Sequence, residues 1–87
     1  MPHLWASIKK IDTVPADAND IATNGAYQVL NNVENCNFGW GTLVHIESVY
    51  AMQYFFGGSG TEFKFAARSR LGNGVWRPWY KVSLTEV

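Results

Sequence analysis

Hydrophobic and polar residues alternate in the stretch "AYQVLN", residues 26–31. Successive side chains of a strand point to opposite faces, so this alternation predicts a strand with one packed face. Its two faces would carry Tyr27 and Val29 on one side and Gln28 and Leu30 on the other. The preceding "NG" pair at 24–25 is a turn signal, and we expect the strand to begin there.

Two stretches rich in β-forming residues follow, "GTLVHIE" (41–47) and "VYAMQYFF" (49–56). They succeed each other almost directly, which predicts a hairpin with a tight turn at Glu47-Ser48. The glycine-rich "GGSG" at 57–60 then predicts a loop after the second strand.

A second clean alternation, "EFKFAARSR" (62–70), predicts the next strand. One face would carry Phe63, Phe65 and Ala67, and the other Lys64, Ala66 and Arg68. Asn73-Gly74 predicts a hairpin turn, and "WRPWYKV" (76–82) predicts a closing strand. Pro78 lacks a backbone N–H, so this strand should lie at a sheet edge or end there.

Alternation along the closing strand would give one face with Trp76, Pro78, Tyr80 and Val82 and another with Val75, Arg77, Trp79 and Lys81. We expect Trp79 to be buried, and Trp40 to serve the core as well, because a short chain depends on large aromatic side chains for burial. Trp76, Arg77 and Tyr80 would then form an outer surface or a subunit interface.

The N-terminal part is less regular. "LWASIKKI" (4–11) fits either a short helix or an edge strand, and "DTVPADANDIATNG" (12–25) reads as a connector. Asp17, Asn19 or Asp20 could cap a single helical turn within it. The predicted fold class is therefore mainly all-β, a small antiparallel sheet or barrel-like domain of about five strands with a short helical turn near the N-terminus.

Length and charge narrow the function classes. The 87 residues suffice for one domain, residues 1–87, and the formal net charge is +0. A protein that neutralises phosphates would show a basic excess, so we expect no nucleic-acid partner. The sequence shows no signal-peptide pattern and no apolar run of membrane-spanning length, and we expect synthesis in the cytoplasm without membrane insertion.

Catalytic chemistry is weakly represented. His45 is the best candidate base, on one strand face with Leu43 and Glu47, but a structural role is the preferred interpretation. Cys36 is the single cysteine and is expected to be a free thiol. No metal-ligand spacing or phosphate-binding loop is visible. We therefore expect no enzyme activity, no metal and no cofactor.

Aromatic side chains on a rigid sheet can stack on the apolar faces of sugars, while neighbouring polar groups bond the hydroxyls. The candidates for such a carbohydrate site are Tyr50, Trp76, Arg77 and Tyr80. The competing interpretation assigns most of the aromatic residues to the core or to a subunit contact.

The order of these motifs resembles the knob domains of R-type pyocin fibres and related phage tail fibres. The similarity rests on "DANDIATNGAYQV", "GWGTLVHI", Gln53 in the next strand, "FKFAARSR" and "WRPWYKV". It covers residues 12–83, the knob-like core. Residues 1–11 lie outside the pattern and could be the end of a shaft, a trimer contact or the start of a free-standing protein.

This resemblance implies a receptor-binding protein of a virion tail fibre, active in host adsorption. Such fibres are homotrimers that associate with other tail-fibre proteins and bind polysaccharide or lipopolysaccharide on the host surface without cleaving it. Some knobs instead act as structural spacers or assembly modules. Both roles remain open from the sequence.

Overall fold

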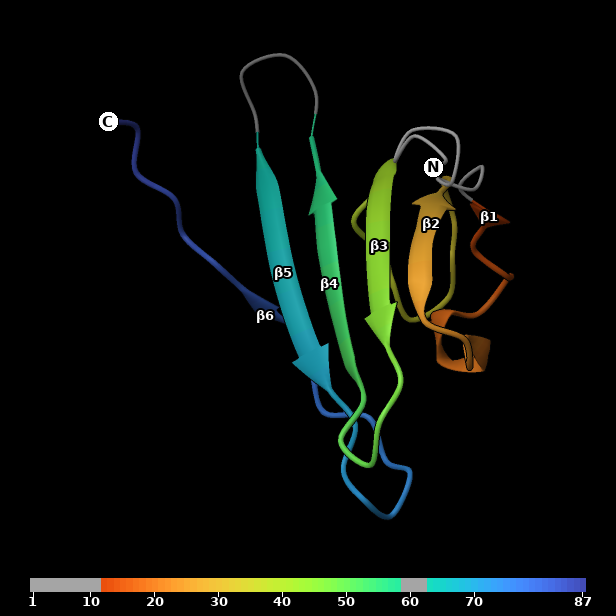
Figure 1. Cartoon of the computed structure of the whole chain (residues 1–87). Helices are drawn as coiled ribbons and strands as arrows, with labels where there is room; N and C mark the ends of the chain where they lie inside the picture. The colour runs from red at the N-terminus through yellow and green to blue at the C-terminus, as the bar shows by residue number, and fades with distance from the viewer. Residues whose placement is uncertain (1–11, 59–62) are drawn as a thin grey trace, which may run out of the picture.

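Strands that follow one another in the sequence lie side by side in one sheet of the computed structural model (Figure 1). The structure describes residues 12–58 and 63–87, and in this part the order across the sheet is β1-β2-β3-β4-β5-β6. The strands are β1 (Asp12–Thr13), β2 (Gly25–Val29), β3 (Gly41–Ile46), β4 (Met52–Gly57), β5 (Lys64–Ser69) and β6 (Tyr80–Lys81). The predicted fold class, mainly all-β with a small sheet, is confirmed.

The N-terminal edge differs from the expected antiparallel arrangement. β1 pairs with β2 in parallel, with Asp12 opposite Tyr27, whereas β2 to β6 pair antiparallel. The expected connector thus contains a sixth strand, β1. Parallel strands must be joined by a long crossover, and residues 14–24 form it. The crossover includes the expected helical turn, the 3-10 helix η1 (Ala18–Asp20), whose N-cap Asp17 accepts from the Asn19 N–H at 2.8 Å.

Two predicted boundaries were wrong. Ile46 pairs with Met52, so residues 47–51 form a five-residue loop and not a tight turn at Glu47-Ser48. The closing strand shrinks to Tyr80–Lys81, and Trp76 makes only an isolated bridge with Arg70. Pro78 explains the second difference, since it cannot donate to a ladder. Residues 4–11, for which a helix or strand was expected, lie outside the described residues.

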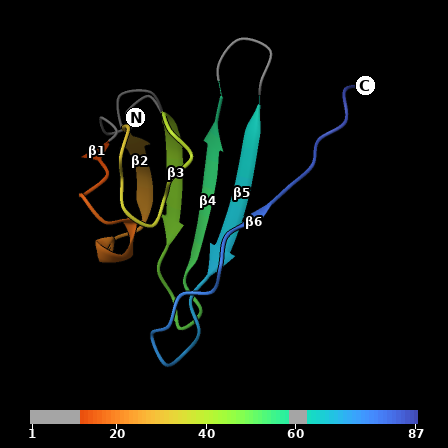
Figure 2. The ribbon, with the colours of Figure 1, turned by 180° about the vertical axis from the view of Figure 1, so that it is seen from behind.

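One face of the sheet, which we call the covered face, carries the core. The register aligns Tyr27, Leu43, Phe55 and Ala66 in one row across β2 to β5. The segment before β2 and the loop from β2 to β3 pass over this face, as Figure 2 shows from behind. The buried hydrophobic cluster consists of Val14, Ala18, Ile21, Val29, Val33, Cys36, Leu43, Phe55 and Ala66.

Two facing glycines make room for the largest core side chain. Gly41 and Gly57 are register partners, and a Cβ on either would come within 2.6 Å of the Phe55 ring. The absence of both side chains lets Phe55 lie flat against the sheet, where Phe38 stacks on it at 5.0 Å. Phe55 is fully buried as a result.

Trp40 does not join this core, contrary to expectation. Its exposed fraction is 61%, whereas Phe38, two residues earlier, packs on Phe55 and fills the place expected for the tryptophan. Gly39 lies between them with a φ of 86°, in the left-handed region that favours glycine, so the chain turns there and Trp40 points away.

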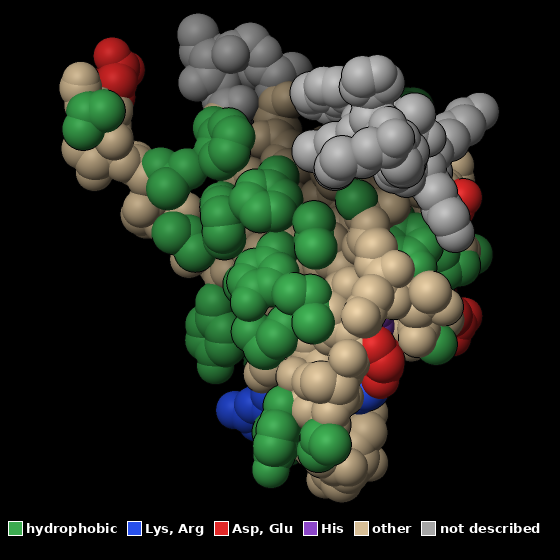
Figure 3. All heavy atoms as spheres, viewed as in Figure 1, with side chains coloured by type: hydrophobic (Ala, Val, Ile, Leu, Met, Phe, Trp, Pro, Cys, Tyr) green, Lys and Arg blue, Asp and Glu red, His purple; other side chains and the backbone are tan. Residues whose placement is uncertain are grey.

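The opposite face, which we call the open face, is apolar as well. The register places on it, across β2 to β6, Ala26, Gln28, Thr42, Val44, Ile46, Met52, Tyr54, Phe56, Phe65, Ala67, Ser69 and Tyr80. Figure 3 shows hydrophobic side chains gathered at the surface over β4 and β5 on this side.

Among the described residues, no helix is long and apolar enough to cross a membrane.

Candidate functional site

A groove lies at the end of the sheet, between the β3–β4 loop and the β5–β6 connection. Figure 1 shows these two segments side by side at that end. We call it the Trp76 groove. Its volume is about 460 Å³, and it is lined by Asn19, Ser48, Val49, Arg70, Gly72, Gly74 and Trp76. Side chains from η1, the β3–β4 loop and the β5–β6 connection therefore meet at one place although they are far apart in the sequence.

The wall formed by residues 71–75 is a tight turn, as Asn73-Gly74 predicted. The Gly74 N–H donates to the Leu71 carbonyl at 2.9 Å, and the Leu71 N–H donates to the Val75 carbonyl at 2.8 Å. Gly74 has a φ of 89°, which favours glycine, and the Asn73 side chain accepts from the Val75 N–H at 3.1 Å. The turn returns the chain so that Trp76 faces Arg70.

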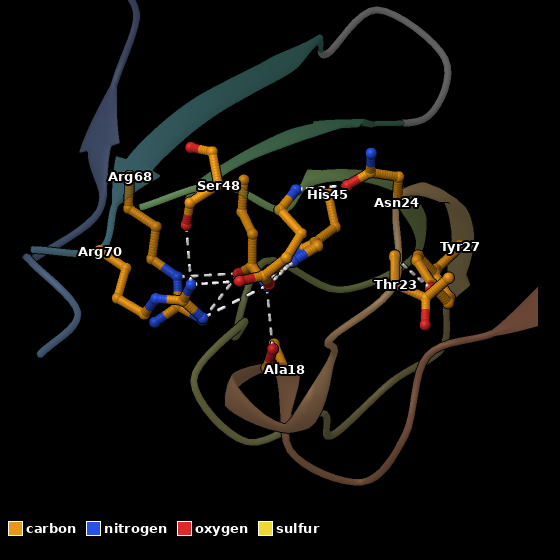
Figure 4. A network of polar contacts seen from close by, with 10 residues as sticks. Ala18, Thr23, Asn24, Tyr27, His45, Ser48, Arg68 and Arg70 are labelled. Atoms are coloured by element: carbon orange, nitrogen blue, oxygen red, sulfur yellow. Dashed lines mark hydrogen bonds and ion pairs between the residues drawn. The ribbon is translucent and has the colours of Figure 1, made fainter. Parts of the chain in front are cut away.

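A buried polar network is centred on Gln53 (Figure 4) and is linked to the groove through Arg68, whose guanidinium contacts the Trp76 ring. The Gln53 carbonyl oxygen accepts from Nε and Nη2 of Arg68 at 2.9 and 2.7 Å. Its amide nitrogen donates to the Ala18 carbonyl at 2.9 Å and to Nδ1 of His45 at 3.1 Å. Gln53 is fully buried, and every hydrogen-bonding group of its amide faces a partner.

These bonds assign the proton of His45. Because Nδ1 accepts from Gln53, the ring proton lies on Nε2, which is 2.8 Å from Oε1 of Glu47. His45 is fully buried, and both ring nitrogens are occupied by protein groups. The geometry agrees with the structural role preferred for His45, on the strand face that it shares with Leu43.

Glu47 joins the network to the loop. Its carboxylate accepts from Arg70 and His45, and its backbone N–H donates to the Asn24 side chain. Arg70 also donates to the Ser48 carbonyl at 3.1 Å, which ties down the β3–β4 loop. Hydrogen bonds from Arg70 and then from His45 lower the pKa of Glu47. The carboxylate is therefore ionised at neutral pH and holds Arg70 at the groove.

Arg68 lies between two tryptophans. Its guanidinium carbon is 4.2 Å from the Trp76 ring centroid and 4.8 Å from the Trp79 centroid. Arg68 is only 5% exposed, and burial lowers its pKa to about 10, so the cation persists at neutral pH. A desolvated cation over an aromatic face gains about 2 kcal/mol, and the two rings thus offset part of the burial penalty.

This arrangement corrects the predicted alternation of the closing strand. Trp76 and Trp79 were expected on opposite faces, but both contact Arg68 on the covered face, because the residues between them leave the sheet at Pro78. Trp79 is half-buried and not fully buried. It packs on Phe38 edge-to-face at 5.2 Å and donates from Nε1 to the Asn35 carbonyl at 2.7 Å.

The four predicted carbohydrate residues are not brought together. Trp76 lines the groove, and Tyr50, 64% exposed, lies at its rim, where a Cβ on Gly72 would be 3.8 Å from the Tyr50 ring. Arg77 is exposed, and its backbone N–H donates a hydrogen bond to the Ser69 carbonyl at 2.8 Å. Tyr80 lies on the open face, opposite Ala67.

Sequence reasoning missed Arg70, Asn19 and Ser48 as groove residues. For Arg70 a signal exists, because the alternation of "FKFAARSR" puts it on the same side as Arg68. Its ring contact with Trp76, at 5.6 Å, follows from that placement. Asn19 and Ser48 come from distant loops, and no local pattern marks them.

Cys36 is a free thiol, as predicted. It is buried in the core cluster, and burial raises its pKa to about 11, so it carries no thiolate at neutral pH. Within residues 12–58 and 63–87, no cluster of three or more His, Cys, Asp and Glu side chains could hold a metal ion.

No protein-family model, curated protein or solved structure matches this chain.

Proposed function

We propose that this chain is a non-enzymatic module of a phage or phage-tail-like fibre that binds host-surface polysaccharide in the Trp76 groove. One observation supports the proposal most strongly. An incompletely buried tryptophan lines a groove, and the arginines beside it fix its position while amide, hydroxyl and guanidinium groups share the lining.

The chemistry of the lining suits a sugar. A pyranose ring has an apolar face that stacks on an indole and a rim of hydroxyls that need donors and acceptors. Asn19 and Ser48 offer both, and Arg70 offers donors only. Because Arg68 holds the Trp76 ring before any ligand arrives, little side-chain entropy is lost on binding.

The similarity of residues 12–83 to pyocin and phage fibre knobs supports the same proposal. By that similarity the chain would be a homotrimeric part of a virion tail fibre, in contact with other fibre proteins, and would bind lipopolysaccharide or capsular polysaccharide during adsorption. Tyr50 at the rim is the second aromatic residue available to a polymer that runs through the groove.

The alternative is a structural spacer or assembly module of a tail fibre, whose aromatic surface packs on a neighbouring subunit. The apolar open face favours it, because exposed contiguous apolar surface marks association sites. The two roles are compatible, since the Trp76 groove lies at the end of the sheet and none of its lining residues is among the open-face positions.

Tryptophan-fluorescence titration against a panel of bacterial lipopolysaccharides and capsular polysaccharides tests the proposal. Trp76→Phe should weaken binding, while the matched Trp40→Phe, at an exposed site outside the groove lining, should leave it unchanged. Equal affinities for both variants would reject the groove. Shortening of the polymer would overturn the non-enzymatic assignment, and silence across the panel would favour the spacer.

A further inference from the structure

The open face has the composition of a buried surface. None of its positions on β2 to β6 carries a charged side chain, and four of them are aromatic, namely Tyr54, Phe56, Phe65 and Tyr80. At the usual strand spacing and rise, these positions cover a projected area of about 400 Å². The accessible area of the side chains is larger than this projected area. It therefore approaches the ~600–1,000 Å² that each partner buries in a standard interface.

The face also has a hollow. Ala67 is a small residue between Tyr54 and Tyr80 in the register, and the space above it is about 160 Å³. The hollow is lined by Met52, Ala67, Arg68, Ser69, Tyr80 and Val82. The Arg68 side chain points to the covered face. The walls on this side are therefore Met52, Ser69, Tyr80 and Val82. The hollow is therefore mainly apolar and large enough for an aromatic ring.

A partly exposed aromatic pair lies in the next row of the register. Phe56 and Phe65 are register partners on β4 and β5, and their rings meet edge-to-face at 4.8 Å. Their mutual packing fixes the rings, and both side chains remain partly exposed. A rigid aromatic pair beside an apolar hollow is complementary to the same face of a second copy.

We propose that the open face is an interface between copies of this chain, in which the Phe56 ring of one copy, held by Phe65, enters the Ala67 hollow of the next. In a closed symmetric assembly each copy donates one aromatic ring and receives another. A sheet with two apolar faces is typical of a middle layer, and the described residues 12–58 and 63–87 cover only one of these faces. The assignment does not rest on carbohydrate binding, since the Trp76 groove lies elsewhere.

The uncharged composition of the open face favours a second copy of this chain as its partner over an unrelated protein. An uncharged sheet face needs an equally uncharged and similarly shaped partner, because a charged side chain would be desolvated without a counter-ion. The same chain supplies such a face in equal amount.

Sedimentation velocity of the purified full chain over a concentration series tests the inference. The wild type should associate, and Ala67→Glu and Phe56→Lys should each weaken association about tenfold or more, which corresponds to ~1.4 kcal/mol. Val75→Glu, at a site that is 54% exposed on the β5–β6 connection, is the matched control and should associate like the wild type. Near-ultraviolet circular dichroism on the same samples checks that each variant is folded.

A mixture of the two variants tests the pairing itself. Each alone should associate more weakly than the wild type, whereas together they should form mixed oligomers, because the ammonium introduced by Phe56→Lys can meet the carboxylate introduced by Ala67→Glu. A monomeric wild type, or equal association of all variants, would overturn the inference. Failure of the folded single variants to recover on mixing would reject the pairing of Phe56 with Ala67. A monomer that still binds polysaccharide would overturn this inference alone and leave the carbohydrate proposal standing.

Discussion

Phe55 and Gln53 are two residues apart on the same face of β4, and both are fully buried, yet they are held in different ways. Phe55 packs on Phe38 and two glycines through contacts that require only shape. Gln53 is held by hydrogen bonds to three residues on three other segments. One end of the covered face therefore depends on shape alone, and the other depends on each hydrogen-bonding partner.

The difference teaches how this small chain combines a core with a surface site. The apolar end stabilises the fold through non-directional contacts. The polar end uses directional contacts, which position Arg68, Arg70 and Trp76 at the groove. A buried cation carries a penalty that only a complete set of partners offsets. The polar end should therefore respond most strongly to a single substitution.

Gln53→Leu should have the largest effect. It keeps the volume of the side chain but leaves the Arg68 guanidinium and His45 Nδ1 without their partner, which should destabilise the fold by about 3–5 kcal/mol. Urea unfolding measures the loss. A change below ~1 kcal/mol would show that the network contributes little to stability and would remove the contrast with the Phe55 end.

Gly41→Ala should have the next largest effect, at the apolar end. The added Cβ would lie 2.5 Å from the Phe56 carbonyl oxygen and 2.6 Å from the Phe55 ring, and overpacking of this kind costs about 1–3 kcal/mol. Gly72→Ala is the matched control, because a Cβ there meets nothing closer than 3.7 Å. Thermal melts of the two variants should differ clearly. Equal melting temperatures would mean that Phe55 can shift without loss.

Acid should produce the smallest change, through Glu47 at the margin of the polar end. The pKa of Glu47 is lowered from 4.5 in the folded state, so its contribution is complete above pH 4.5 and is lost as the pH falls through the lowered value. Thermal melts of the wild type and Glu47→Gln should differ at neutral pH and converge in acid. The pKa of Asp17 is also lowered, first by Asn35, so only the difference between the two proteins reports on Glu47. A difference that persists unchanged into acid would contradict this role.

Local features of the sequence were sufficient for most of the strands. The alternation in residues 26–31 and 62–70 and the turn at Asn73-Gly74 anticipate β2, β5 and the wall of the groove, because pleating and turn chemistry act over a few residues. The helical turn near the N-terminus was anticipated in the same way, from residues able to cap it.

Only the tertiary structure decided which face is buried and which residues meet. Alternation separates Phe65 and Ala67 from Ala66 and Arg68, but it does not say that the arginine side is the covered one. That outcome depends on Gln53, 15 residues away, and on the tryptophans that follow the turn at residues 71–75. The placement of Phe38 and not Trp40 on Phe55, and the parallel pairing of β1, likewise arise from long-range packing. Short-range patterns reflect the geometry of one strand, whereas burial and site assembly depend on partners that the chain meets only once it is folded.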